Sequence, residues 1–372
     1  MGFQGTPGVT LRKQILFSAG EDSGDILGET AVAAALALGF RAAGAGGARM
    51  NAQGLESLVP YEELPVSGFG DVLPRYFRLK KHLKTLESAL ANPECKAFVA
   101  IDYPGFNMRL KALAEKLGKP VFYIAPPQIW AWKAHRGAQF QGTPCAVLYS
   151  FEEEIYRRHG ALVSKLNHPF EQSSVDVKWN ANSGQILFLP GSRLKAALRN
   201  LSLYVSTAQA IFERDSRIKI IFGVSREALY AKLREKIPPC FSVEVLPAEA
   251  HARALFFAEC RSVLAVPGTA HAEAFLCGVP SVAASRVELL TYLLGKKFLK
   301  TPFLTVPNLV TQQPLIPEHY IPAGKSFSAL SHQIAAELVD VSPEFQESAS
   351  KYRFHFQGIP LENWIRERLE VL

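Results

Sequence analysis

Two short polar segments of this sequence each follow an apolar, strand-like run and precede a run with helical spacing. The first, Ser18–Asp25, reads Ser-Ala-Gly-Glu-Asp-Ser-Gly-Asp, and the second, Leu189–Arg193, reads Leu-Pro-Gly-Ser-Arg. The start of a helix has unpaired N–H groups and a partial positive charge, so both segments suit an anionic ligand. Because they lie far apart in the chain, we expect two strand–loop–helix domains that face a shared cleft.

The segments Leu189–Arg193 and Pro267–Ala270 predict a nucleotide-diphosphate site in the second half of the chain. Gly191 permits close backbone approach, and Arg193 can bind a phosphate through paired donors. Glu273, one turn into the later helix, could accept from two ribose hydroxyls. Singly, these features fit equally well an ordinary capped turn or a carboxylate that complements a helix dipole. Together they favour nucleotide binding by Gly191, Ser192 (also the expected helix cap), Arg193, Gly268, Thr269 and Glu273.

The segment Glu21–Asp25 crowds three carboxylates around a tight turn. Such a group can bind sugar hydroxyls or remove a proton from one of them. The same residue types are common at helix N-termini, and taken alone this cluster is better explained as a cap. Its candidate ligand-binding residues are Glu21, Ser23, Gly24 and Asp25.

Asp102 ends a predicted strand and begins the sharp turn Asp-Tyr-Pro-Gly-Phe-Asn, which closes at Asn107. Its carboxylate is a candidate general base, and it could equally cap the helix that follows. The loop Pro126–Trp132, which contains Trp130, is aromatic and proline-flanked. It suits sugar stacking or lipid contact, although tryptophans more often pack in a core.

The segments Arg75–Lys84 and Leu289–Phe303 each combine basic and apolar residues. This composition suits an anionic membrane surface, or a lipid that carries phosphate and acyl chains. An ordinary amphipathic helix with a lysine-rich exposed face is the common alternative, and only the presence of two such segments favours the membrane.

Composition describes an ordinary globular protein. The chain has 372 residues, 48% hydrophobic and 20% charged, with a net charge of +7. Its length favours two domains, and its charge favours anionic partners. The 5 cysteines form no Cys-x-x-Cys pair, so neither a disulfide framework nor a zinc site is expected, and a reducing cytoplasm fits best. No apolar run reaches the ~18 residues of a membrane span.

Strand-like and helix-like runs alternate along the chain, which predicts doubly wound parallel sheets of the α/β class. The expected domains are 12–166 and 184–342, joined by a polar linker over 167–183, with helices over 343–372 packing back on the body. The predicted strands are Gln14–Phe17, Ala97–Ile101, Val121–Ile124, Val147–Tyr149, Ile186–Leu189, Lys219–Phe222, Ser242–Leu246, Ser262–Ala265 and Ser281–Ala284.

Taken in order, these motifs resemble the bacterial lipid-A-disaccharide synthase family. The resemblance covers Gln14 to Glu318, and the ordered set is specific although no single piece is. The matching pieces are Ser18–Asp25, Gly44–Gly54, Gly68–Arg75, Ile101–Asn107, Pro127–Trp132, His168–Pro169, Leu189–Arg193, Gly268–Ala270 with Glu273, and Thr291–Asn308.

The resemblance implies a GT-B glycosyltransferase with two Rossmann-like domains and an interdomain cleft. Such an enzyme transfers 2,3-diacylglucosamine from UDP-2,3-diacylglucosamine to 2,3-diacylglucosamine 1-phosphate (lipid X), inverts the anomeric carbon, and works at the inner face of the inner membrane. It implies no metal, no cofactor and no nucleic acid, and leaves a homodimer open. It implies nucleotide contacts for Arg193, Glu273 and Asn308. We predict that the acceptor is bound by Glu21, Ser23, Gly24, Asp25, Asn107 and Trp130.

The sequence departs from the family pattern at several motif positions. The family's second Asp in the Asp102 turn, a leading candidate for the base, is Gly105 here. The other residues that depart from the family's motifs are Asn167, Ala196, Pro267 and Gln312–Pro314. Two alternatives therefore stand beside an active synthase: a relative that binds UDP-sugar or lipid without turnover, and another GT-B enzyme resembling UDP-N-acetylglucosamine 2-epimerase.

Overall fold

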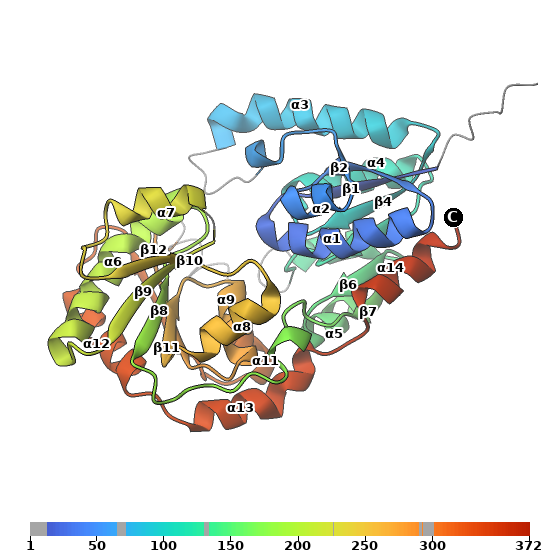
Figure 1. Ribbon diagram of the computed structural model, residues 1–372. Helices are drawn as coiled ribbons and strands as arrows, with labels where there is room; N and C mark the ends of the chain where they lie inside the picture. Colours follow the sequence, from blue (N-terminus) through green and yellow to red (C-terminus); the bar gives the residue numbers. More distant parts are fainter. Residues whose placement is uncertain (1–12, 65–71, 130–133, 226, 290–291, 293–300) are drawn as a thin grey trace, which may run out of the picture.

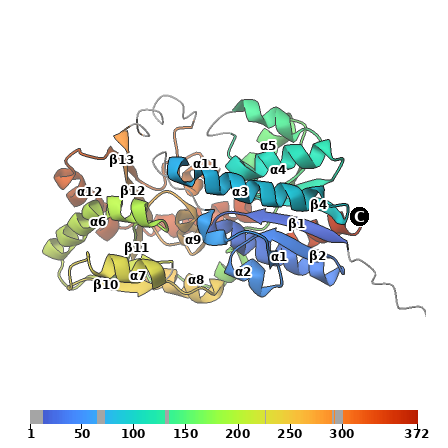
Figure 2. The same ribbon diagram turned by 90° about the horizontal axis from the view of Figure 1, so that it is seen from above.

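The computed structural model describes residues 13–64, 72–129, 134–225, 227–289, 292 and 301–372. These residues form two α/β domains side by side, each built on a parallel β-sheet (Figures 1 and 2). The fold class predicted from the alternation of strands and helices is therefore confirmed.

The N-terminal sheet has 7 strands in the order β3-β2-β1-β4-β5-β6-β7. The strand order reverses direction between β1 and β4, so the carboxyl ends of these two strands form the switch point where such sheets bind ligands. The strands are β1 (Gln14–Ala19), β2 (Arg41–Ala45), β3 (Glu56–Ser57), β4 (Cys95–Ile101), β5 (Val121–Ile124), β6 (Pro144–Val147) and β7 (Leu162–Lys165).

The C-terminal sheet has 6 strands in the order β10-β9-β8-β11-β12-β13, and its switch point lies between β8 and β11. The segments Leu189–Arg193 and Pro267–Ala270 follow these two strands directly. The strands are β8 (Gln185–Leu189), β9 (Lys219–Val224), β10 (Ser242–Val245), β11 (Ser262–Ala265), β12 (Ser281–Val287) and β13 (Glu318–Pro322).

Helices cover both faces of each sheet, which is why the central strands are apolar throughout rather than alternating. In β1, for example, Ile15, Leu16 and Phe17 are all fully buried. The helices are α1 (Asp22–Ala37), α2 (Ala48–Ala52), α3 (Val72–Ala91), α4 (Pro104–Lys116), α5 (Ser150–Arg158), α6 (Leu194–Arg214), α7 (Glu227–Arg234), α8 (Ala250–Ala258), α9 (Thr269–Leu276), α11 (Val306–Thr311), α12 (Ser328–Val339), α13 (Glu344–Tyr352) and α14 (Leu361–Leu369).

The chain passes from one domain to the other twice. It first runs from β7 to β8 through an irregular segment that contains a 3₁₀ turn at Gln172–Ser174. After α13 it returns, and α14 packs on α1 of the N-terminal domain, where Trp364, Ile365 and Leu369 are fully buried. The C-terminus therefore lies beside the N-terminal domain (Figures 1 and 2).

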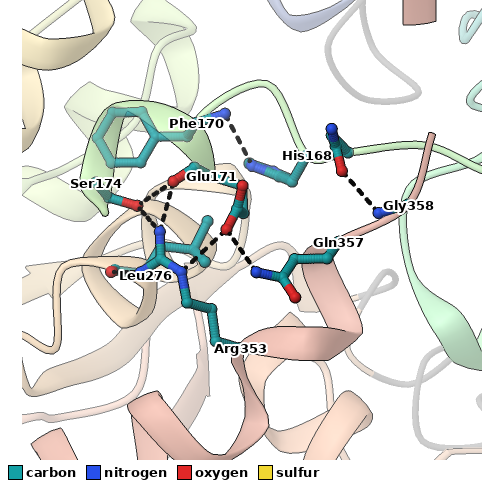
Figure 3. Close-up of polar contacts among 9 residues, drawn as sticks. His168, Phe170, Glu171, Ser174, Leu276, Arg353, Gln357 and Gly358 are labelled. Carbon is teal, nitrogen blue, oxygen red and sulfur yellow. Dashed lines mark hydrogen bonds and ion pairs between the residues drawn. The ribbon is translucent and has the colours of Figure 1, made fainter. Parts of the chain in front are cut away.

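A polar cluster joins the two crossings (Figure 3). The guanidinium of Arg353 pairs with the carboxylate of Glu171 at 3.0 Å and donates to the Leu276 carbonyl at 2.9 Å and to the Ser174 hydroxyl at 2.8 Å. Gln357 donates to the same Glu171 carboxylate at 3.0 Å. Both crossings are thus tied to the C-terminal domain at one place.

The sequence predicted the central strands closely and missed peripheral elements. Each of the nine predicted strands lies on or next to an observed strand, usually within a few residues of its bounds. The strand β2 was missed because its end was interpreted as a glycine-rich turn at Gly44–Gly47. The elements β3, β7, β13 and α12 were not predicted either.

The basic segment Arg75–Lys84 is helical, as expected, and lies within α3. Most of Leu289–Phe303 lies outside the described residues, as does Trp130. Within the described part of the chain, no helix has the length and apolarity needed to cross a membrane.

Candidate functional site

The loops at the two switch points meet through Glu21 and Arg193. Glu21 immediately precedes α1, and Arg193 immediately precedes α6. Their side chains form an ion pair that joins the two domains, with 32% of the Glu21 side chain and 40% of the Arg193 side chain exposed. Arg193, the sequence's candidate phosphate ligand, is thus held at the domain junction by a carboxylate.

Arg49 makes a second contact between the two domains. Arg49, which follows the Gly46–Gly47 turn, donates to the carbonyl of Ala248 at 2.7 Å and pairs with Glu29 at 3.1 Å. Sequence reasoning missed Arg49, since a single arginine after a glycine turn has no distinguishing pattern.

The turn that contains Gly191 needs a glycine. Its φ of +127° is a conformation that L-residues rarely adopt. The preceding carbonyl, that of Pro190, accepts from the buried Asn200 amide at 3.1 Å, which fixes the loop. The helix α6 has Arg193 at its N-cap and no side-chain cap, so the expected capping by Ser192 is wrong. Ser192 is exposed instead.

The backbone at Asp102 and Tyr103 is left-handed at two successive residues, with φ values of +47° and +46°. Each such non-glycine residue costs about 1–2 kcal/mol, so the surrounding structure must hold the turn. The Tyr103 ring lies where a side chain at Gly20 would be, with a Cβ there only 2.4 Å from its Cγ. The Tyr103 hydroxyl donates to the Leu64 carbonyl at 2.6 Å.

The Asp102 carboxyl has a raised pKa, of about 6. Burial is the main cause, and the negative charge of Glu21 adds to it, while the Tyr103 N–H and Arg193 act in the opposite direction. A carboxylate that titrates near neutrality and lies by the domain junction has the properties of a general base.

Glu273 lies in α9, whose N-cap is Gly268. Gly268 and Thr269 are exposed at the start of this helix. Burial raises the pKa of Glu273, and Arg253, at 3.4 Å, opposes this shift. Arg253 was not predicted from the sequence.

Tyr149, the N-cap residue of α5, is buried and has a perturbed hydroxyl. Burial and the charges of Glu152, Glu273 and Asp102 all raise the pKa of its hydroxyl. Asp102 and Glu273 belong to different domains, and both contribute to this shift. Tyr149 was not predicted to be part of the site.

Three predicted ligand residues are engaged inside the protein instead. The carboxylate of Asp25 accepts from the N–H groups of Gly47 at 2.8 Å, Arg49 at 3.0 Å and Met50 at 3.2 Å, so it caps α2. Asn107 and Asn308 are both fully buried. Each of these three side chains is therefore held inside the protein, and its role as an acceptor or nucleotide ligand stays a prediction.

Asn308 joins α11 to the segment before β13. Its amide donates to the Ile316 carbonyl at 2.7 Å and to Glu318 at 3.0 Å, and its oxygen accepts from the Ile316 N–H at 2.8 Å. Gly24 also has a packing role, because a Cβ there would lie 3.3 Å from that of Ala19. Of the predicted acceptor residues with described placement, Glu21 and Ser23 remain partly accessible.

The His168 ring is buried beside two aromatic rings. Its centre lies 6.0 Å from that of Tyr149 and 5.8 Å from that of Phe356. Burial lowers its pKa to about 4, so the ring is neutral at physiological pH. Its Nδ1 accepts from the Phe170 N–H at 3.3 Å (Figure 3). Among the residues whose placement is described, no cluster of three or more His, Cys, Asp or Glu side chains could hold a metal ion.

The sequence matches the family model for lipid-A-disaccharide synthetase over residues 15–358. The chain belongs to the lipid-A-disaccharide synthetase family. Among curated members, the lipid-A-disaccharide synthase of Pseudomonas putida is 31% identical over 336 residues, covering 87% of this chain and 88% of its own. That of Granulibacter bethesdensis is 29% identical over 323 residues, covering 82% and 81%.

Solved structures show that this family member has the GT-B fold. A UDP-N-acetylglucosamine 2-epimerase from Listeria monocytogenes matches with a TM-score of 0.58 and 10% identity, over 96% of this chain and 95% of its own. The calicheamicin glycosyltransferase matches with a TM-score of 0.55 and 16% identity, over 97% and 98%. At these identities the likeness concerns the fold alone, whereas the family match favours the synthase over the epimerase-like alternative.

Proposed function

We propose that this glycosyltransferase moves 2,3-diacylglucosamine from UDP-2,3-diacylglucosamine to the 6-hydroxyl of 2,3-diacylglucosamine 1-phosphate, forming a β-1,6-linked disaccharide and releasing UDP. The family match over residues 15–358 carries this proposal. The meeting of the two switch-point loops through Glu21 and Arg193 supports it, because a donor and an acceptor must be held against each other.

The donor diphosphate binds in the C-terminal domain at the loops after β8 and β11. Arg193 and the backbone N–H groups of the exposed residues Gly268 and Thr269 supply donors, and the starts of α6 and α9 add partial positive charge. These groups stabilise the charge that develops on the departing UDP. Glu273 accepts from the ribose hydroxyls, and the guanidinium of Arg253, 3.4 Å away, orients its carboxylate.

The acceptor attacks in one displacement. Asp102 removes the proton of the 6-hydroxyl as its oxygen bonds to C1 of the donor sugar, and the bond from C1 to the diphosphate oxygen breaks with its electron pair leaving on UDP. Attack opposite the leaving group inverts C1. A base with a pKa of about 6 is ionised at neutral pH and still basic enough to assist.

Asp102 is the carboxylate available in its turn, since the family's second Asp is Gly105 here. Gly105 lies in the first turn of α4 and is exposed, with no atom within 4 Å of the position of an added Cβ. We therefore assign the base to Asp102 alone.

Both substrates carry acyl chains, and α3 offers a surface for the membrane that contains them. Its exposed residues include the cations Arg78, Lys80, Lys81 and Lys84 and the aromatic Phe77, which is 79% exposed. Cations with an exposed aromatic residue on one helix favour an anionic lipid surface. We propose that the protein works at the inner face of the bacterial inner membrane.

The test is to incubate the purified protein with UDP-2,3-diacylglucosamine and lipid X and to measure tetra-acyl disaccharide phosphate and UDP by mass spectrometry. Equal amounts of both products are expected, with none from an unacylated donor and none from Asp102→Asn. UDP binding by calorimetry without any product would instead identify a relative that binds nucleotide but does not turn over.

A further inference from the structure

The carbonyl oxygen of Asp102 accepts two hydrogen bonds from side chains. The amide of Asn107, in α4, donates to it at 2.9 Å, and the hydroxyl of Tyr123, in β5, donates to it at 2.9 Å. Both bonds hold Asp102, the first of the two successive residues whose backbone is left-handed. A non-glycine residue leaves that conformation unless its neighbours prevent it.

Asn107 holds more than this carbonyl. Its amide also donates to the carbonyls of Ser18 at 2.9 Å and Ile101 at 3.2 Å, so one side chain joins the ends of β1 and β4 at the switch point. Because it is fully buried, it acts on a ligand only through the backbone it holds.

Tyr123 fixes the same residue from the neighbouring strand. It is fully buried, and its ring packs edge-on against Phe140 at 5.6 Å between ring centres. The next residue of β5, Ile124, accepts from the Asp102 N–H at 2.9 Å. The strand β5 thus holds both the N–H and the carbonyl of Asp102.

We propose that Asn107 and Tyr123 are positioning residues, which hold the left-handed turn so that the carboxylate of Asp102 points at the acceptor hydroxyl. This inference rests on the proposed function, in which Asp102 is the base. Loss of either donor allows the peptide after Asp102 to rotate, and the carboxylate then moves away from the reacting hydroxyl. Displacements of about 1 Å can cost around a hundredfold in rate.

The mild variant is Tyr123→Phe, which removes one hydroxyl and keeps the packed ring. We expect kcat to fall about tenfold or more while KM for both substrates stays within about twofold, because positioning acts in the transition state. The matched control is Tyr204→Phe, since the buried Tyr204 hydroxyl donates to the Ala284 carbonyl at 3.0 Å in the other domain. The control should leave kcat unchanged.

The titration of Asp102 supplies a readout that does not need turnover. Among the described residues, the charges of Glu21 and Arg193 act on this carboxyl, and the phenols of Tyr103 and Tyr149 are also coupled to this site. Tyr123→Phe removes the phenol of Tyr123, whose hydroxyl meets the Asp102 carbonyl, and alters none of these four groups. The experiment is an NMR titration of protein labelled with ¹³C at its aspartate carboxyl groups. The Asp102 signal is the one that is absent from Asp102→Asn, and its chemical shift is followed against pH. A carboxyl released towards water in Tyr123→Phe should titrate about one pH unit lower.

The outcomes separate the two claims. If the wild type forms no disaccharide, the proposed function fails, and the titration alone still decides the positioning role. If Tyr123→Phe keeps the wild-type titration, the positioning role is overturned, whatever happens to kcat. The harsher Asn107→Ala should lower the Asp102 titration further, and UDP binding would confirm that it is folded.

Discussion

The carboxylate of Glu21 and the guanidinium of Arg193 pair across the two domains, each at the start of a helix that follows a switch-point strand. Arg193 is also the side chain that the proposed function assigns to the donor diphosphate. A nucleotide that binds to Arg193 must therefore compete with Glu21 for the same donors.

Replacing Glu21 by Gln should tighten UDP binding. The variant removes the competing charge and leaves Arg193 free, and a partly exposed ion pair contributes about 0.2–1 kcal/mol, which is up to about fivefold in affinity. Calorimetric titration with UDP measures this. Asp340→Asn is the control, because Asp340 pairs with Arg214 at 2.7 Å at the other end of α6. Weaker binding by Glu21→Gln would show that Glu21 does not compete.

The rate should fall in acid as Asp102 takes up a proton. Because its pKa is about 6, kcat should halve near that pH and drop about tenfold for each unit below it. Pre-steady-state rates across the pH range would show this. In Glu21→Gln, the acid limb of the curve of kcat against pH should move to lower pH, since Glu21 helps to raise this pKa. A limb near pH 4 in the wild type would contradict the assignment of Asp102.

Asp102→Asn should abolish turnover and yet stabilise the fold at pH 7. The folded state favours the protonated carboxyl, so stability is lost as the pH rises from about 4 to about 6, and the variant avoids this loss. The gain should be on the order of 1–3 kcal/mol at pH 7 and vanish near pH 4. Denaturant unfolding at both pH values tests this, and an equal change at both would refute it.

Gly105→Asp tests whether the family's missing carboxylate is needed. The position has space for a side chain, and an acidic residue in the first turn of α4 should add about 0.3–1 kcal/mol of stability. We expect kcat to change by less than about threefold, because the proposed mechanism assigns the base to Asp102. A much larger increase would transfer the role of base to position 105.

Arg353→Ala should strongly destabilise the protein. It leaves the nearly buried carboxylate of Glu171, 9% exposed, without its cation, and such losses cost about 3–5 kcal/mol. Arg366→Ala is the control, because Arg366 pairs with the exposed Glu362 within α14 and should cost at most about 0.5 kcal/mol. Similar urea midpoints for the two variants would contradict this view of the crossing.

His168→Asn should make the fold less sensitive to acid. The folded state resists protonation of His168 down to about pH 4, whereas the unfolded chain takes up the proton near 6.5, so wild-type stability falls as the pH drops between these values. The difference should reach about 2–3 kcal/mol. The free energy of unfolding, measured from pH 7 to 4, should fall less steeply with decreasing pH for the variant than for the wild type. Parallel slopes would rule out a role for His168.

The sequence predicted the positions of site residues well where they directly follow a strand that is itself evident as an apolar run. Strands such as β8 are buried apolar runs, and a residue directly after such a strand must lie at the sheet's carboxyl edge. That argument alone brought Glu21, Asp102 and Arg193 to the right edges of their sheets.

Peripheral strands depended on contacts that the sequence does not show. The strand β2 reads Arg-Ala-Ala-Gly-Ala, with no β-branched residue. It pairs closely with β1 because Gly44 lacks a Cβ, which would lie 1.9 Å from the Phe17 carbonyl oxygen. Likewise, nothing near Asp25 in the sequence indicates that its carboxylate caps α2, since that helix reaches it only through the tertiary fold.

The packing of α14 on α1 has a consequence for the making of this protein. The part of α1 that α14 covers stays exposed until Trp364 and Ile365 have been synthesised, because both are fully buried there. The N-terminal domain can therefore complete its core only after nearly the whole chain has left the ribosome. Neither half of the gene, expressed separately, would encode all of that domain.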